Sequence, residues 1–269
     1  MTLRDLLWVW GMKVNALQAT ADYAAFPFAE SKTNTEETIQ RTGITNVYIA
    51  GGLPITEKTL DEIPSAKRLV CKTSAHLYEN GKNVPGINNA IDVLENAKRL
   101  ALYDRRIDSF ALDDFSTGSL SSGVSESDME RFCFSNQQNF PSLPLHGTIY
   151  PMSLQDKRLP PYLRFFDQLV LPIWFVDEVG KTYEYIDQLN LISGHKPILF
   201  CLYVYDFGAH KIATRADMKK QLDIAEALLH NRKITGCILL GTCLFDIGLE
   251  AAEYMFDWIR AVGDDRIGV

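Results

Sequence analysis

Eight short apolar segments, rich in β-branched or aromatic residues, recur along the 269-residue chain and alternate with segments of helical periodicity. Several of the eight are continuous apolar runs, which is typical of parallel strands covered on both faces. Their spacing of roughly 22 to 40 residues is the length of one strand–helix unit. The predicted strands are Leu7–Trp10, Asn46–Ala50, Arg68–Thr73, Ser109–Asp113, Leu145–Tyr150, Gln168–Trp174, Ile198–Tyr205 and Gly236–Gly241.

The intervening segments carry signals for eight helices. Ile87–Leu102 places apolar residues on one face at a 3.6-residue period, and Ser125 with Asp128 forms a start resembling a capping box. The prolines at 160 and 161 predict a short or broken helix within Leu154–Phe166. The other predicted helices are Asn34–Thr42, Thr56–Ile63, Ser125–Asn136, Val176–Ile192, Thr214–His230 and Leu249–Val262.

This alternation predicts an α/β protein, a single (β/α)8 TIM barrel formed by residues 1–269. A doubly wound open sheet would require a glycine-rich turn after its first strand, and Gly11-Met-Lys-Val-Asn has no second glycine. No linker or low-complexity segment suggests a domain boundary.

Composition narrows the classes of function. The chain is 46% apolar and has a net charge of −7, so it is globular and lacks the basic surface of a nucleic-acid binder. No apolar run approaches the roughly 18 residues of a membrane span. The N-terminal sequence MTLRDLLWVWGMKV is not typical of a signal peptide, which favours a cytoplasmic protein, although a removed leader would leave the same picture. The sequence does not indicate an oligomeric state.

Cysteine and histidine usage does not favour metal chemistry. The five cysteines include no C-x-x-C pair, and three of them (Cys71, Cys201 and Cys237) lie in apolar runs, as expected for buried, reduced thiols. No H-x-H pair follows the first strand, and nucleotide-binding motifs are absent. We therefore expect no metal and no cofactor.

In a TIM barrel the active site lies at the carboxyl ends of the strands. Acids occur there after the fourth predicted strand (Asp113 and Asp114) and after the seventh (Asp206). Glycoside hydrolysis needs two carboxyl groups, and aromatic rings provide platforms for sugars. Candidate substrate-binding residues at the same ends are Trp10, Lys72, His76, Tyr150, Trp174 and Tyr205, and Gly51-Gly52 is a weak anion-binding signal.

Each candidate also has a purely structural interpretation. The Asp113–Asp114 pair could form a helix cap and a salt bridge, and Asp206 an Asx-turn. The tryptophans could be core residues. Lys72 could form a Schiff base, or simply a salt bridge. Strand alternation favours Asp114 pointing into the barrel mouth, because Phe110 and Leu112 would then fill the interior.

The segment IDSFALDDFSTG (residues 107–118) resembles the DDF segment after strand four of bacterial glycoside-hydrolase-like TIM-barrel proteins, a largely uncharacterised group. The N-terminal WVWG and residues 202–260 are similar to the first strand and the last two strand–helix units of that group. The resemblance implies a (β/α)8 fold, a carbohydrate ligand, and Asp113, Asp114 and Asp206 at the site. Two departures matter: well-known retaining barrels have glutamates at these strand ends, and the D-x-x-D-x-D-x-E pattern of chitinase-like barrels is missing.

The leading hypothesis is a glycoside hydrolase that binds a small or oligomeric sugar over aromatic residues (Trp10, Trp174 and Tyr205). Asp114 would be the general acid and Asp206 the nucleophile or base, with Asp113 shifting the pKa of Asp114 by charge repulsion. Asp114→Asn and Asp206→Asn should each abolish turnover with little change in thermal stability. The alternatives are a non-catalytic carbohydrate-binding barrel and a lyase or aldolase that uses Lys72.

Overall fold

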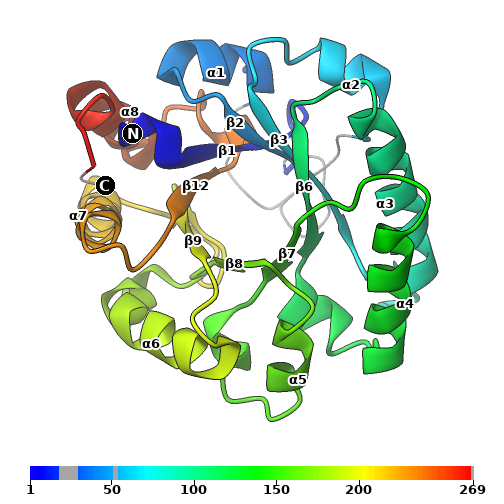
Figure 1. Cartoon of the computed structure of the whole chain (residues 1–269). Helices are drawn as coiled ribbons and strands as arrows, with labels where there is room; N and C mark the ends of the chain where they lie inside the picture. Colours follow the sequence, from blue (N-terminus) through cyan, green and yellow to red (C-terminus); the bar gives the residue numbers. More distant parts are fainter. Residues whose placement is uncertain (18–29, 51–53, 268–269) are drawn as a thin grey trace. The chain divides into compact units, whose positions relative to one another are not determined.

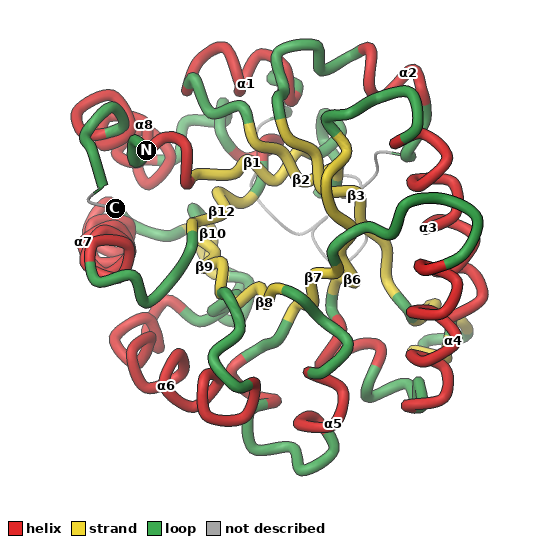
Figure 2. The backbone as a smooth tube through the Cα atoms, in the orientation of Figure 1, coloured by secondary structure: helices red, strands yellow, loops and turns green. Residues whose placement is uncertain are grey.

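The computed structural model describes residues 1–17, 30–50 and 54–267. Among these residues, eight parallel strands form a closed barrel in the order β1-β12-β9-β8-β7-β6-β3-β2, with helices around it (Figures 1 and 2). The strands are β1 (Leu7–Gly11), β2 (Asn46–Ile49), β3 (Arg68–Ser74), β6 (Ile107–Asp113), β7 (Leu145–Thr148), β8 (Gln168–Leu171), β9 (Ile198–Tyr203) and β12 (Gly236–Leu240). The predicted (β/α)8 fold class and its eight strands are confirmed.

The helices begin where the sequence provides caps. Asn34 with Glu37, Ser125 with Asp128, and Thr214 with Asp217 form reciprocal capping boxes at α1, α4 and α7. Pro160 and Pro161 lie in the first turn of α5, which is only five residues long, as the predicted short helix requires. The helices are α1 (Thr35–Thr42), α2 (Glu57–Asp61), α3 (Ile87–Ala101), α4 (Glu126–Gln137), α5 (Leu159–Leu163), α6 (Thr182–Ser193), α7 (Arg215–His230) and α8 (Glu250–Val262). None of the described helices has the length and apolar character needed to cross a membrane.

Two hairpins were not predicted. β4 (His76–Glu79) pairs antiparallel with β5 (Lys82–Pro85) through a turn in which Asn80 and Gly81 both have positive φ, at 50° and 80°. An Asn-Gly pair is the typical signal for this turn. The second hairpin pairs β10 (Tyr205–Asp206) with β11 (Lys211–Ile212), so the predicted seventh strand is divided between β9 and β10.

Contacts divide the chain into two compact units. Unit 1 comprises Met1–Arg68, Ile173–Gly180 and Phe200–Val269. In this unit the rings of Trp8 and Trp10 pack against Tyr48. Unit 2 comprises Leu69–Pro172 and Lys181–Leu199. The close polar contacts that are described below for Asp113 and Asp114 all lie in unit 2.

The predicted alternation of β6 is wrong. The Phe110 ring contacts Phe132 of α4, with ring centroids 6.1 Å apart, so Phe110 packs against a helix and does not fill the barrel interior. The opposite face of β6 carries Ala111, whose register partner on β7 is the buried His146. A large side chain thus stands next to the small one, and because it comes from β7 the composition of β6 alone could not reveal it.

Candidate functional site

The carboxyl ends of β3, β6 and β7 bring together Lys72, Asp113 and Thr148 in unit 2. The Lys72 ammonium donates a hydrogen bond to Asp113 Oδ2, and the two side chains are 14% and 13% exposed. The Thr148 hydroxyl donates to Asp113 Oδ1 at 3.3 Å. Asp113 is therefore an ion-paired carboxylate with both oxygens engaged.

Asp114 directs its side chain differently because the strand ends immediately before it. Its backbone is left-handed (φ 49°, ψ 33°), a conformation that aspartate tolerates better than most residues. A π-helical turn follows, η3 (Phe115–Ser119), and the Asp114 carbonyl accepts a hydrogen bond from Gly118 N at 2.7 Å. This break in alternation places two consecutive acids at the same strand end.

Tyr150, just beyond β7, connects Asp114 to the turn. Its hydroxyl donates to Asp114 Oδ1 at 2.5 Å, and its backbone N–H donates to Ser116 Oγ at 2.9 Å. Tyr150 is buried, with 4% of its surface exposed. Tyr150 therefore lies beside Asp114, and its role in substrate binding stays a prediction.

The two acids have different electrostatic surroundings. Burial, reinforced by the neighbouring Asp113 charge, raises the pKa of Asp114 to about 6, although Tyr150 and Lys72 act in the opposite direction. Asp113 has its charge paired with Lys72. Two carboxyl groups whose environments differ in this way are the usual basis for one acid and one charged partner in an active site.

His76, the first residue of β4, borders the same cluster. Its Nδ1 lies 3.2 Å from Ser119 Oγ, and its ring packs so closely on Gly118 that there is no room for a Cβ at that position. Burial, as the main cause, lowers the pKa of His76 below its usual value. Burial thus favours the neutral form of the imidazole, which can hydrogen-bond without a charge.

Asp206 lies in unit 1 and has the contacts of a turn residue. Its Oδ1 accepts a hydrogen bond from Ala209 N at 2.7 Å, its Oδ2 accepts one from Val176 N at 3.0 Å, and its side chain is 1% exposed. The Lys211 ammonium lies 3.9 Å away. These contacts match the Asx-turn interpretation, and the catalytic role of Asp206 stays a prediction.

The predicted aromatic platforms, also in unit 1, are mostly packed. Trp10 is 7% exposed and stacks on Tyr48 with ring centroids 5.4 Å apart, and Tyr205 is 1% exposed and contacts Phe207. Trp174 is partly exposed and offers some ring surface. Gly51 and Gly52 lie outside the described residues.

Sequence reasoning did not assign roles to Ser116, Ser119 or Thr148. Thr148 stands at a strand end, so its position was visible, but its pairing with Asp113 depends on the register of β6 and β7. The serines lie in the segment that most resembles a loop in the sequence. They reach the site because that segment turns back through η3.

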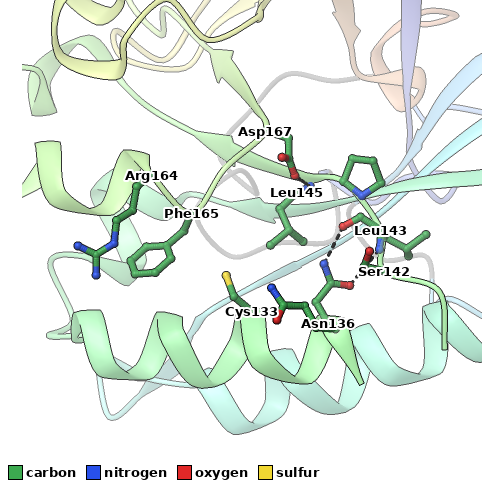
Figure 3. Close-up of a pocket in the computed structure, with 10 residues that line it drawn as sticks. Cys133, Asn136, Ser142, Leu143, Leu145, Arg164, Phe165 and Asp167 are labelled. Carbon is green, nitrogen blue, oxygen red and sulfur yellow. Dashed lines mark hydrogen bonds between the residues drawn. The ribbon is translucent and has the colours of Figure 1, made fainter. Parts of the chain in front are cut away.

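A pocket of about 490 Å³ lies at the opposite, amino ends of β7 and β8 (Figure 3). Its polar side chains largely hydrogen-bond to the main chain. The Asn136 amide donates to the Leu143 carbonyl oxygen and accepts from Leu143 N, and Asp167 accepts from Leu145 N at 2.8 Å. The free thiol of Cys133 also lines it. In TIM barrels this end serves stability, and the chemistry takes place at the other end.

No protein-family model matches the chain, and no curated protein is significantly similar to it in sequence. Solved glycoside hydrolases share its fold. A GH113 β-mannanase from Alicyclobacillus acidocaldarius superimposes with a TM-score of 0.56 at 8% identity, over 97% of this chain and 98% of its own. A xylanase from Cellvibrio japonicus gives a TM-score of 0.51 at 8% identity over 97% of both chains.

A β-D-glucuronidase from Dictyoglomus thermophilum gives a TM-score of 0.54 at 8% identity over 86% of this chain. The chain spans only 47% of that enzyme and 32% of a Bacteroides uniformis β-glucuronidase. At these identities the similarity shows the fold alone. The protein is a (β/α)8 barrel whose fold resembles those of glycoside hydrolases.

Proposed function

We propose that the protein is a glycoside hydrolase in which Asp114 is the general acid. One observation carries the proposal: two consecutive carboxyl groups at a strand end, one ion-paired with Lys72 and the other turned toward Tyr150 in a site that raises its pKa to about 6. Cleavage of a glycosidic bond requires a carboxyl group that is still protonated near neutral pH, so that it can protonate the leaving oxygen.

The structurally similar enzymes support a carbohydrate substrate without identifying it. They are a β-mannanase, a xylanase and a β-D-glucuronidase, and the first two match this chain over nearly their whole solved length. The cluster around Asp114 also fits a hydroxyl-rich ligand, because it combines a carboxylate, an ammonium, hydroxyls and an imidazole.

The contacts of Lys72 favour the hydrolase over the lyase or aldolase alternative. A Schiff-base lysine must present a neutral amine to a carbonyl group, and activation requires a desolvated or cationic environment. Lys72 is instead ion-paired with the carboxylate of Asp113, an anionic environment and not a cationic one. This ion pair matches the other interpretation of Lys72 from the sequence, that of a salt-bridge residue.

The test compares leaving groups. A panel of aryl glycosides first identifies a substrate, and wild type and Asp114→Asn are then compared on its phenyl and 2,4-dinitrophenyl glycosides. We expect the variant to lose about 10²- to 10⁴-fold in kcat/KM on the phenyl glycoside. The loss in kcat/KM on the dinitrophenyl glycoside should be far smaller, because dinitrophenolate leaves without protonation.

The exposed Asp92 of α3 provides the matched control, since Asp92→Asn makes the same chemical change away from the cluster. It should leave both rates unchanged. An equal loss on both leaving groups would contradict the role of Asp114 as an acid. Saturable sugar binding without any product from the panel would favour the non-catalytic carbohydrate-binding barrel.

A further inference from the structure

We infer, building on the glycosidase function proposed above, that the β4–β5 hairpin forms a sugar-binding subsite with Tyr78 as its platform, so that the protein prefers oligosaccharides to glycosides of a single sugar. The hairpin follows directly from the carboxyl end of β3, the strand that carries Lys72. The hairpin, Lys72 and the two acids at the end of β6 all belong to unit 2. A chain of sugars bound at Asp114 can therefore continue onto the hairpin.

One face of the hairpin meets η3, the turn that begins directly after Asp114. On this face the His76 ring packs on Gly118, and its Nδ1 lies 3.2 Å from Ser119 Oγ. Side chains two residues apart on a strand share a face, so Tyr78 lies on the same face as His76, roughly 6–7 Å further along β4. The Tyr78 ring thus extends the surface that begins beside the acids.

The chemistry of this face suits a carbohydrate. Tyr78 is 76% exposed, and its register partner on β5, directly opposite on the same face, is the exposed Asn83. An aromatic ring offers an apolar surface to the C–H groups of a sugar, and an amide both donates to hydroxyl groups and accepts from them. The charged pair Glu79 and Lys82 lies on the opposite face, so the face of Tyr78 combines a ring with an uncharged polar group.

The base of the hairpin is fixed to the rest of unit 2. Gly86 N donates a hydrogen bond to the Ala75 carbonyl oxygen at 2.8 Å. Leu77, on the face opposite Tyr78, packs so closely on Gly86 that the glycine has no room for a Cβ. β5 also packs against η3. A ring that is already held in place loses less conformational freedom when a ligand binds, which favours binding.

The experiment compares the aryl glycosides of single sugars with gluco-, manno- and xylo-oligosaccharides of two to six β-1,4-linked units, whose products are separated by chromatography. In the wild type we expect kcat/KM to rise with chain length. Tyr78→Ala should lower kcat/KM on the longest substrate about 3- to 10-fold, mainly by raising KM, which is the effect expected from the loss of one aromatic contact. The loss on the aryl glycoside should be much smaller, because a single sugar at Asp114 does not reach the hairpin.

Two further variants separate a ring contact from a general effect of the substitution. Tyr78→Phe keeps the ring and should keep the preference for long substrates. Tyr103→Ala truncates a tyrosine that is 82% exposed beyond the end of α3, near the amino end of β6, and should leave every rate unchanged.

Two results would overturn the subsite and leave the glycosidase proposal standing. The first is a wild-type kcat/KM that does not rise with chain length, and the second is an equal loss in Tyr78→Ala on long and short substrates. Failure of the wild type to hydrolyse any glycoside or oligosaccharide would overturn both the subsite and the glycosidase proposal.

Discussion

At the scale of single residues, the site separates two chemically identical side chains by their partners. Asp113 follows the strand and meets Lys72, whereas Asp114 adopts left-handed backbone and meets Tyr150. Burial and the Asp113 charge favour the neutral form of Asp114, and Lys72 opposes them. Lys72 therefore affects both carboxyl groups: it donates a hydrogen bond to Asp113 and lowers the pKa of Asp114.

This arrangement predicts how activity and stability depend on pH. A general acid must be protonated, so kcat/KM should fall as pH rises through about 6, the pKa of Asp114. Because this pKa is raised above 3.8, the native state binds more protons than the unfolded state between those values. The contribution of Asp114 to stability is therefore present below pH 3.8 and is lost as pH rises through about 6.

In Lys72→Met the fall of kcat/KM should occur at higher pH, because the substitution removes the positive charge that lowers the pKa of Asp114. The measurement is a kcat/KM profile from pH 4 to pH 9 on any substrate found in the panel. Lys82→Met, on the exposed strand β5, removes the same charge away from the cluster and should leave the profile in place. If kcat/KM of Lys72→Met falls at the same pH as that of the wild type, the group that controls this fall is not Asp114.

At the scale of elements, Asp206 joins the β10–β11 hairpin to the start of η5 (Val176–Lys181). Its two oxygens accept the N–H groups of Ala209 and Val176, both within unit 1. An aspartate with these contacts stabilises a local arrangement of backbone, whatever its part in catalysis. The expectation that its replacement leaves stability unchanged must therefore be revised.

Asp206→Asn should destabilise the protein by about 1–3 kcal/mol, because an amide can accept only one of the two backbone N–H groups and its NH₂ faces the other. The measurement is the urea midpoint of unfolding. Asp177→Asn is a good control, since Asp177 also lies near Lys211 but its side chain is 88% exposed. An unchanged midpoint together with lost activity would restore the catalytic role predicted from the sequence.

The sequence predicted elements better than it predicted their junctions. Eight strands and the helix caps follow from local signals, namely apolar runs and Asn, Ser or Thr ahead of an acid. The direction of Phe110 and the break at Asp114 depend on α4 and on the turn after β6, which are not encoded in strand alternation. Candidate acids could be named from the sequence, but their pairing with Lys72 and Tyr150 required the register of the strands.

At the scale of the whole molecule, the barrel buries most of its thiols. Cys71, Cys201, Cys237 and Cys243 are buried, Cys133 is partly exposed, and none of the five is in a disulfide. Burial raises the pKa of Cys133 to about 11, so this thiol is protonated and slow to react near neutral pH. The reactivity of the cysteines therefore reports opening of the fold.

In native protein at pH 7.5, a disulfide reagent should label at most Cys133, slowly, and all five thiols should react in denaturant. Cys133→Ser should remove the native signal. Cys71 lies in unit 2, whereas Cys201, Cys237 and Cys243 lie in unit 1, so mass spectrometry of labelled peptides can follow each unit separately. If residues 1–269 unfold as the single domain that the sequence predicts, these four thiols will become reactive over the same range of urea concentration. Labelling of one unit at lower urea would instead show that the units open independently.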